Sequence, residues 1–262
     1  MKKMITTCMA SLAVLSSQAV AEFNFDNVPE KLSAHYLAGI QSVDTIKSKL
    51  TANGFTVLAT DNVLKGKTVI TISNDELKAT NSYMATLHIL VNSAESEVRV
   101  QNPSYLGAAY IKGYKYGDFK ATVNALEKAL STMIPVLQQK EMDELAGYHF
   151  MFGMPYLEDT ITVSKSGKLP SKSVLYSLKL PNGATLVGHK LSAKTHQFLN
   201  TIQQDKNAQL LPYESMLNGG KATILDPKYY LALSLPNLSM GEFMKIATVP
   251  DAIEKEIENA YK

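Results

Sequence analysis

The residues best suited to chemistry lie together in one segment, 148–156, which is rich in aromatic and methionine side chains. If residues 148–152 are extended, the side-chain period of two places His149 and Met151 on one face, and the following glycine can turn Met154 back towards them. The favoured interpretation of the segment is packed core, in which methionine fills gaps. One imidazole and two thioethers suit Cu(I), so a copper- or haem-handling site at these residues is kept as an alternative.

Tyrosine side chains are the second group of candidates, because a phenol ring combines apolar area with a hydroxyl and suits ligand pockets. Three of them, Tyr110, Tyr114 and Tyr116, stand in a glycine-rich stretch, 107–117, which favours an exposed contact surface. The first two of these, with aromatic residues of the first segment, define the expected ligand-binding set: Tyr148, His149, Phe152, Tyr156, Tyr110 and Tyr114.

Motifs for catalysis are missing from the sequence. The chain has five histidines: His35, His88, His149, His189 and His196. No two are three or four residues apart, the spacing that places two metal ligands on one helix face. His88 and His189 fall in apolar runs and are interpreted as hydrogen-bonded strand residues. Gly-x-Ser-x-Gly does not occur. We therefore expect no catalytic residue, and keep a hydrolase assembled from distant residues as an alternative.

The composition is that of a globular chain, with 262 residues, 45% hydrophobic and 19% charged. The 26 basic residues include a single arginine, Arg99. Nucleic-acid and phosphate recognition usually relies on the guanidinium group, so a nucleic-acid partner is not expected.

The first 21 residues have the pattern of a cleavable export signal. Two lysines precede an apolar stretch of about twelve residues, and small residues at 19–21 form a cleavage site, so we expect a mature chain that begins at Glu22 in a bacterial periplasm. The one cysteine, Cys8, would leave with the signal, which excludes disulfides and thiolate chemistry from the mature protein. No apolar run reaches the ~20 residues of a membrane-spanning helix.

An internal comparison divides the chain into two similar halves. Over positions 98–130, five residues recur identically at an offset of 124: Pro103, Tyr105, Ala108, Gly117 and Phe119. An acidic run at 141–144 follows a polar stretch and is the best candidate for a boundary. We therefore expect a signal peptide at 1–21, a first α+β domain at 22–140 and a second at 141–262.

Capping residues and hydrophobic periodicity predict the individual elements. Helices are expected to begin at Ser42, near Phe119, at Ser192, at Ser239 with Glu242 in a capping box, and at Pro250. Strands are expected at 55–58, 68–73, 84–91, 98–101, 160–163, 174–180, 184–188, 209–213, 222–225 and 229–235. Asn182-Gly183 suits a hairpin turn. Many strands joined by short turns predict an α+β fold with mostly antiparallel sheets.

This order of elements resembles the bacterial domain-of-unknown-function family 302. The specific part is a helix over 44–53 followed by Gly-Phe-Thr-Val at 54–57, whereas the second half has Gln-Leu-Leu-Pro at 209–212 in the equivalent place. The resemblance implies two tandem β-α-β-β-β-β-α domains related in shape to the TATA-binding-protein fold. It brings no activity to carry over.

These observations predict an exported, non-catalytic binding or accessory protein for a small apolar ligand or a protein partner. The site is expected between the two halves, near residues 148–156, because an apolar cleft forms most readily at such a junction.

Overall fold

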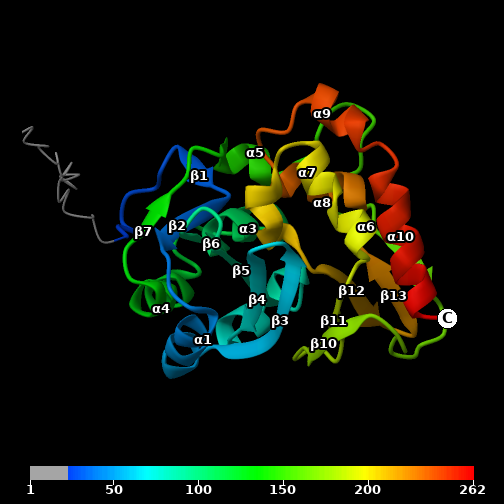
Figure 1. Ribbon diagram of the computed structural model, residues 1–262, viewed down its shortest axis with the longest axis horizontal. Helices are drawn as coiled ribbons and strands as arrows, with labels where there is room; N and C mark the ends of the chain where they lie inside the picture. The colour runs from blue at the N-terminus through cyan, green and yellow to red at the C-terminus, as the bar shows by residue number, and fades with distance from the viewer. Residues whose placement is uncertain (1–22) are drawn as a thin grey trace, which may run out of the picture.

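The computed structural model describes residues 23–262, so the expected signal peptide lies outside the described part. Two antiparallel sheets form the framework, one in each half of the chain (Figure 1). The first sheet has six strands in the order β3 (Thr56–Leu64), β4 (Lys67–Ser73), β5 (Leu87–Asn92), β6 (Glu97–Gln101), β2 (His35–Gly39) and β7 (Met133–Pro135).

The second sheet repeats the strand order of the first over five strands. It runs β10 (Val174–Lys179), β11 (Thr185–His189), β12 (Tyr213–Asn218), β13 (Lys221–Ile224) and β9 (Ile161–Ser164). In both sheets two hairpins lie side by side, and the earliest strand, β2 or β9, returns to pair with the last strand of the second hairpin. Asn182-Gly183 turns β10 into β11, as expected, with Gly183 at φ +87°.

Ten helices and a small third sheet complete the described part of the chain. The small sheet pairs β1 (Lys31–Ser33) with β8 (Gln139–Glu141). The helices are α1 (Val43–Ala52), α2 (Asp75–Lys78), α3 (Pro103–Tyr110), α4 (Lys120–Leu130), α5 (Met142–Ala146), α6 (Ala193–His196), α7 (Phe198–Thr201), α8 (Pro227–Ser234), α9 (Met240–Lys245) and α10 (Val249–Ala260). Two 3₁₀ turns are η1 (Tyr83–Ala85) and η2 (Asp205–Leu210). The expected α+β fold is confirmed.

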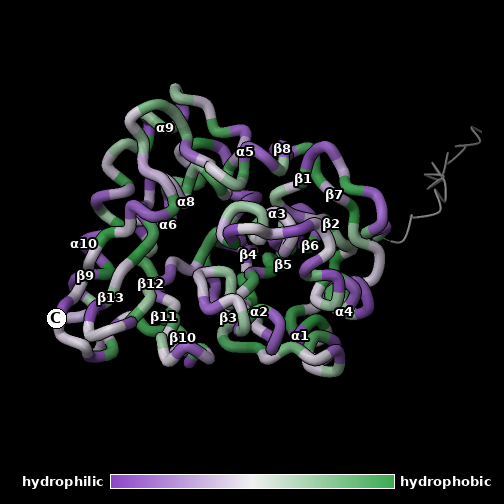
Figure 2. The backbone as a smooth tube through the Cα atoms, turned by 180° about the vertical axis from the view of Figure 1, so that it is seen from behind, coloured by the Kyte–Doolittle hydropathy of each residue, from purple (hydrophilic) through white to green (hydrophobic). Residues whose placement is uncertain are grey.

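Local signals set several helix ends as the sequence predicts. The Ser42 hydroxyl accepts a hydrogen bond from the Thr45 amide at the start of α1. The reciprocal Ser239 and Glu242 capping box opens α9. Helices α4 and α10 bury one apolar stripe each, and the tube in Figure 2 alternates there between hydrophobic and hydrophilic colours. Among residues 23–262, no helix is long and apolar enough to cross a membrane.

Three expectations about elements are wrong. Residues 209–213 are not a strand, because Gln209 and Leu210 end the 3₁₀ turn η2 and β12 begins only at Tyr213, after Pro212, which has no amide hydrogen for a sheet ladder. Residues 229–235 are not a strand, because most of this run belongs to helix α8. Its apolar side chains are buried on nearly all sides, which removes the periodic pattern that separates a helix from a strand. The decisive signals are Asp226, whose side chain caps the helix, and Pro227 in its first turn. The helix expected from Ser192 is also broken, into α6 and α7.

The two halves share their cores. The cluster that holds one face of the first sheet against α1, α3 and α4 also contains Tyr229, Ala232 and Leu233 of α8. The other face of the first sheet contributes Val69 and Leu90 to the cluster of the second half. We call the contact between this second face and the second half the seam. Both faces of the first sheet are therefore covered by protein.

Polar bonds also join the two halves of the chain. Lys67 of β4 lies 2.8 Å from a carboxylate oxygen of Asp205 in η2, and its side chain is only 6% exposed. The Tyr83 hydroxyl donates to the Thr223 carbonyl at 2.9 Å, and the Tyr105 hydroxyl donates to the Leu233 carbonyl at 2.8 Å. Buried polar contacts of this kind fix the position of one half on the other.

Candidate functional site

The seam face of the first sheet carries polar side chains at alternate strand positions. His88 and Leu90 lie on the same face of β5, because strand residues two apart point the same way, and Leu90 packs into the core of the second half. Arg99 and Gln101 share the seam face of β6 in the same manner. All four are buried, so this face is polar but not solvent-exposed.

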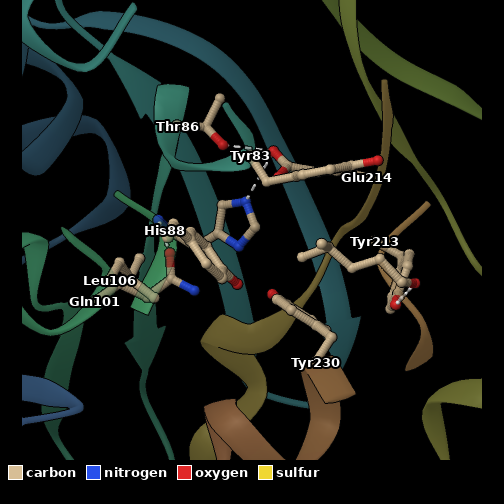
Figure 3. Close-up of a pocket in the computed structure, with 10 residues that line it drawn as sticks. Tyr83, Thr86, His88, Gln101, Leu106, Tyr213, Glu214 and Tyr230 are labelled. Atoms are coloured by element: carbon tan, nitrogen blue, oxygen red, sulfur yellow. Dashed lines mark hydrogen bonds and ion pairs between the residues drawn. The ribbon is translucent and has the colours of Figure 1, made fainter. Parts of the chain in front are cut away.

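A small cavity lies in the seam, and Figure 3 shows its lining. The residues around it are Tyr83, Thr86, His88, Gln101, Leu106, Tyr110, Tyr213, Glu214, Leu225 and Tyr230. Six belong to the first half of the chain and four to the second. The space that the centre of a water molecule can occupy is about 20 Å³, which is room for a water molecule or a small ion.

His88 is the most constrained group in this cavity. Its backbone amide donates to the Gln101 side-chain oxygen at 2.8 Å, and its Nδ1 lies 3.0 Å from the Gln209 carbonyl oxygen. A carbonyl can only accept, so Nδ1 carries the hydrogen and the neutral ring has its lone pair on Nε2. Among the described residues, Nε2 has no hydrogen-bond partner, although the side chain is only 3% exposed.

The carboxylate of Glu214 faces His88 across the cavity (Figure 3). Its Oε1 lies 3.7 Å from His88 Nε2, and the Glu214 side chain is 10% exposed. The same oxygen accepts hydrogen bonds from Thr86 Oγ1, at 2.5 Å, and from the Tyr176 hydroxyl. Burial raises the pKa of Tyr176 well above its usual value, so this phenol keeps its proton and remains a donor.

Gly188 allows Tyr176 to reach Glu214. Tyr176 of β10 is paired with Gly188 of β11, and a Cβ at position 188 would overlap the Tyr176 ring. The ring therefore lies directly on the backbone of β11, an approach that only glycine permits. This contact fixes one of the two donors to the Glu214 carboxylate.

Four tyrosine rings form much of the remaining wall. Three of their hydroxyls already donate to main-chain carbonyls: Tyr83 to Thr223, Tyr213 to Leu225 and Tyr230 to Leu210, at 2.9, 2.8 and 2.6 Å. The fourth, Tyr110, has a buried hydroxyl with no hydrogen-bond partner among the described residues. Burial raises the pKa of all four phenols.

A second polar cluster lies next to the cavity in the seam. The Arg99 guanidinium donates from Nη1 to His35 Nε2 at 2.8 Å and to Asn207 Oδ1 at 3.0 Å, and its Nε lies 2.5 Å from Glu97 Oε1. Burial, with a smaller contribution from the positive charge of Arg99, lowers the pKa of His35 to about 3. His35 is therefore neutral near pH 7 and accepts from Arg99.

The ligand-binding residues expected from the sequence are distributed over several places. Tyr110 lines the cavity, and both Tyr110 and Tyr114 border a surface groove beside α5. Tyr114 stacks on Phe119, with ring centroids 6.1 Å apart. Tyr148 is buried against Tyr229 of α8, with centroids 5.9 Å apart.

The rest of segment 148–156 consists of turns and bends, and residues 148–152 are not an extended strand. The rings of His149 and Tyr156 are in contact, with centroids 4.5 Å apart. Met151 is 39% exposed and Phe152 fully exposed, whereas Met154 packs against the core of the second half.

The described residues contain no group of three or more His, Cys, Asp and Glu side chains placed to hold a metal ion. This finding does not include methionine ligands, so a copper site at His149, Met151 and Met154 stays a prediction. The outward position of Met151 and the packed position of Met154 do not add support to it.

Sequence reasoning did not single out His88 and Glu214 as a pair. They lie on strands of different sheets, and no spacing rule connects residues so far apart in the chain. The only usable signal was His88 itself, a polar residue inside an apolar strand. No family model, curated protein or solved structure matches this chain.

Proposed function

We propose that this protein is a non-catalytic binding protein whose ligand site is the seam cavity. The observation that carries the proposal is the unpartnered Nε2 of His88, a buried polar atom directed at a buried carboxylate. Proteins rarely leave such an atom without a partner, and a bound ligand is one reason to do so. The polar lining favours a small polar molecule over the apolar one expected from the sequence.

The bonding of the cavity supports binding over catalysis. A nucleophilic hydroxyl would have to lie within hydrogen-bond reach of His88 Nε2, and no described residue does. The Thr86 hydroxyl, which belongs to another lining residue, donates to Glu214 instead. An acid, a base and a nucleophile are therefore not assembled around this histidine.

The test compares two histidine variants, His88→Leu in the cavity and His149→Leu in segment 148–156. Binding of methylammonium, acetamide, phenol and acetate is measured by ligand-observed NMR on the purified protein. We expect at least one probe to bind the wild type and His149→Leu but not His88→Leu, because His88 lines the cavity and His149 does not.

The same pair of variants can refute the proposal. Binding that survives His88→Leu and disappears in His149→Leu would move the site to segment 148–156. A far-UV circular dichroism spectrum of each variant shows whether loss of binding reflects loss of the fold.

We also propose that the protein is exported to a periplasm, and this rests on the signal pattern in residues 1–21. Expression of the full chain in a Gram-negative host, followed by cell fractionation and intact-mass analysis, is expected to give a periplasmic species that begins at Glu22. A full-length species confined to the cytoplasm would contradict this.

The two halves, we further propose, are related modules. Support comes from the matching strand order of the two sheets and from α3 and α8, which begin with prolines at the sequence offset of 124. The side chains of Asn102 and Asp226 cap these two helices in the same way.

A further inference from the structure

Two hydrogen-bond acceptors face each other in the seam cavity. His88 Nδ1 donates to Gln209, so the neutral ring offers only a lone pair at Nε2. The Glu214 oxygen opposite, 3.7 Å away, is a carboxylate oxygen that already accepts from Thr86 and Tyr176. While the ring is neutral and the carboxyl group is ionised, neither group can donate to the other. A group that donates to both atoms would satisfy this pair.

The walls supply few hydrogens for such a bond. The hydroxyls of Tyr83, Tyr213 and Tyr230 are directed at main-chain carbonyls, as described above. These carbonyls therefore already use the three hydroxyl hydrogens. Among the lining residues, the Tyr110 hydroxyl is buried without a hydrogen-bond partner in the described part of the chain. The ligand must bring its own donors to His88 and Glu214.

The charge of the cavity selects among possible donors. Within the described part of the chain, no lysine or arginine nitrogen lies within 4.0 Å of a Glu214 oxygen, and His88 is its one ionisable basic neighbour at that distance. A neutral donor such as a hydroxyl would leave a buried carboxylate without a counter-charge, which is costly. A cation would supply it.

From this arrangement we infer that the seam cavity binds a small primary amine in its ammonium form, held between His88 and Glu214 and enclosed by Tyr83, Tyr110, Tyr213 and Tyr230. The inference rests on the proposed binding function and names the class of ligand. An ammonium group has three hydrogens, enough for Nε2, the carboxylate and the free Tyr110 hydroxyl. The volume of about 20 Å³ limits the bound head group to the size of ammonium or methylammonium.

The decisive variant is Glu214→Gln. The glutamine oxygen can still accept from Thr86 and Tyr176, while its amide can donate to His88 Nε2, so the fold is expected to be kept. The negative charge and the facing acceptors are both removed. Glu256→Gln is the matched control, because Glu256 of α10 also accepts from hydroxyl groups, those of Ser192 and Thr195, but does not line the cavity.

The probe is methylammonium chloride, titrated against sodium chloride at equal ionic strength. Binding is followed by the ¹⁵N chemical shift of His88 Nε2 and by the midpoint of thermal unfolding. We expect saturable binding to the wild type, a weakening of at least about tenfold in Glu214→Gln, and no change in Glu256→Gln. Tyr110→Phe is expected to weaken binding without changing the fold, because only one hydroxyl oxygen is lost.

Four results would overturn the inference. A His88 ring that is doubly protonated at pH 8 would pair with Glu214 directly and leave no place for the amine. Equal binding of potassium and methylammonium would indicate a site for monovalent cations in general. Binding of acetamide or phenol to the cavity, without methylammonium, would refute the amine while keeping the proposed function. If none of the probes binds in a His88-dependent way, the proposed function fails as well.

Discussion

Replacing Arg99 by methionine is expected to lower the free energy of unfolding by about 3–5 kcal/mol, because it removes one partner of a buried ionic cluster. Arg99 is 7% exposed and bonds to Glu97, His35 and Asn207. Methionine approximates its length but leaves three polar groups without their donor. Arg99→Lys is expected to rescue little, since a single ammonium cannot reproduce the fork of the guanidinium. Equilibrium unfolding in urea measures both effects.

The control for this prediction is Lys31→Met. Lys31 pairs with Glu141 at 4.0 Å, and both side chains are about half exposed, 49% and 51%. Surface pairs of this kind contribute at most about 1 kcal/mol, so little change is expected. A loss below about 1 kcal/mol in Arg99→Met as well would contradict the expectation that the buried Arg99 cluster stabilises the fold.

Lowering the pH from 8 to 5 is expected to destabilise the protein by about 4 kcal/mol through two buried histidines. Burial, with the charge of Arg99, lowers the pKa of His35 to about 3, and burial lowers the pKa of His189 to about 4, both from 6.5. At a pH between the pKa of each histidine in the folded protein and its pKa of 6.5 in the unfolded chain, the unfolded chain binds a proton that the folded protein does not. Stability is therefore full above pH 6.5 and falls as the pH decreases towards 4.

Urea unfolding at a series of pH values checks this prediction. His189→Asn is expected to remove about half of the pH-dependent loss, because one titrating group is gone while asparagine can still bond to Ser215, the partner of His189 Nε2. Burial also lowers the pKa of His196, which acts in the same direction. A free energy of unfolding that stays constant from pH 8 to 5 would contradict the prediction.

The sequence predicts the elements best where local chemistry marks their ends. Ser42, the Ser239 and Glu242 capping box, Pro250 and the Asn182-Gly183 turn all act within a few residues, and each lies where expected. The error at 229–235 has the opposite origin. A helix buried on nearly all sides has no polar face, so only tertiary packing distinguishes it from a buried strand.

The candidate site could be predicted only in small part. Of the ligand-binding residues expected from the sequence, Tyr110 lines the seam cavity, whereas segment 148–156 does not. His88 and Glu214 meet because the second half covers the polar face of β5, and nothing in the neighbourhood of either residue encodes that contact. A polar face on a strand usually contacts solvent, whereas this one is buried against the other half of the chain.

The return of the earliest strands to the far side of each hairpin pair determines when the protein can fold. β2 pairs with β6 and β7, and β1 pairs with β8, more than a hundred residues later. The core of this first sheet also needs Tyr229 and Leu233 from near the end of the chain. A chain that emerges N-terminus first must therefore wait for its last quarter before the first sheet is closed on both faces. For the export that we propose from residues 1–21, such late closure would keep the polypeptide unfolded enough to pass through a narrow translocation channel.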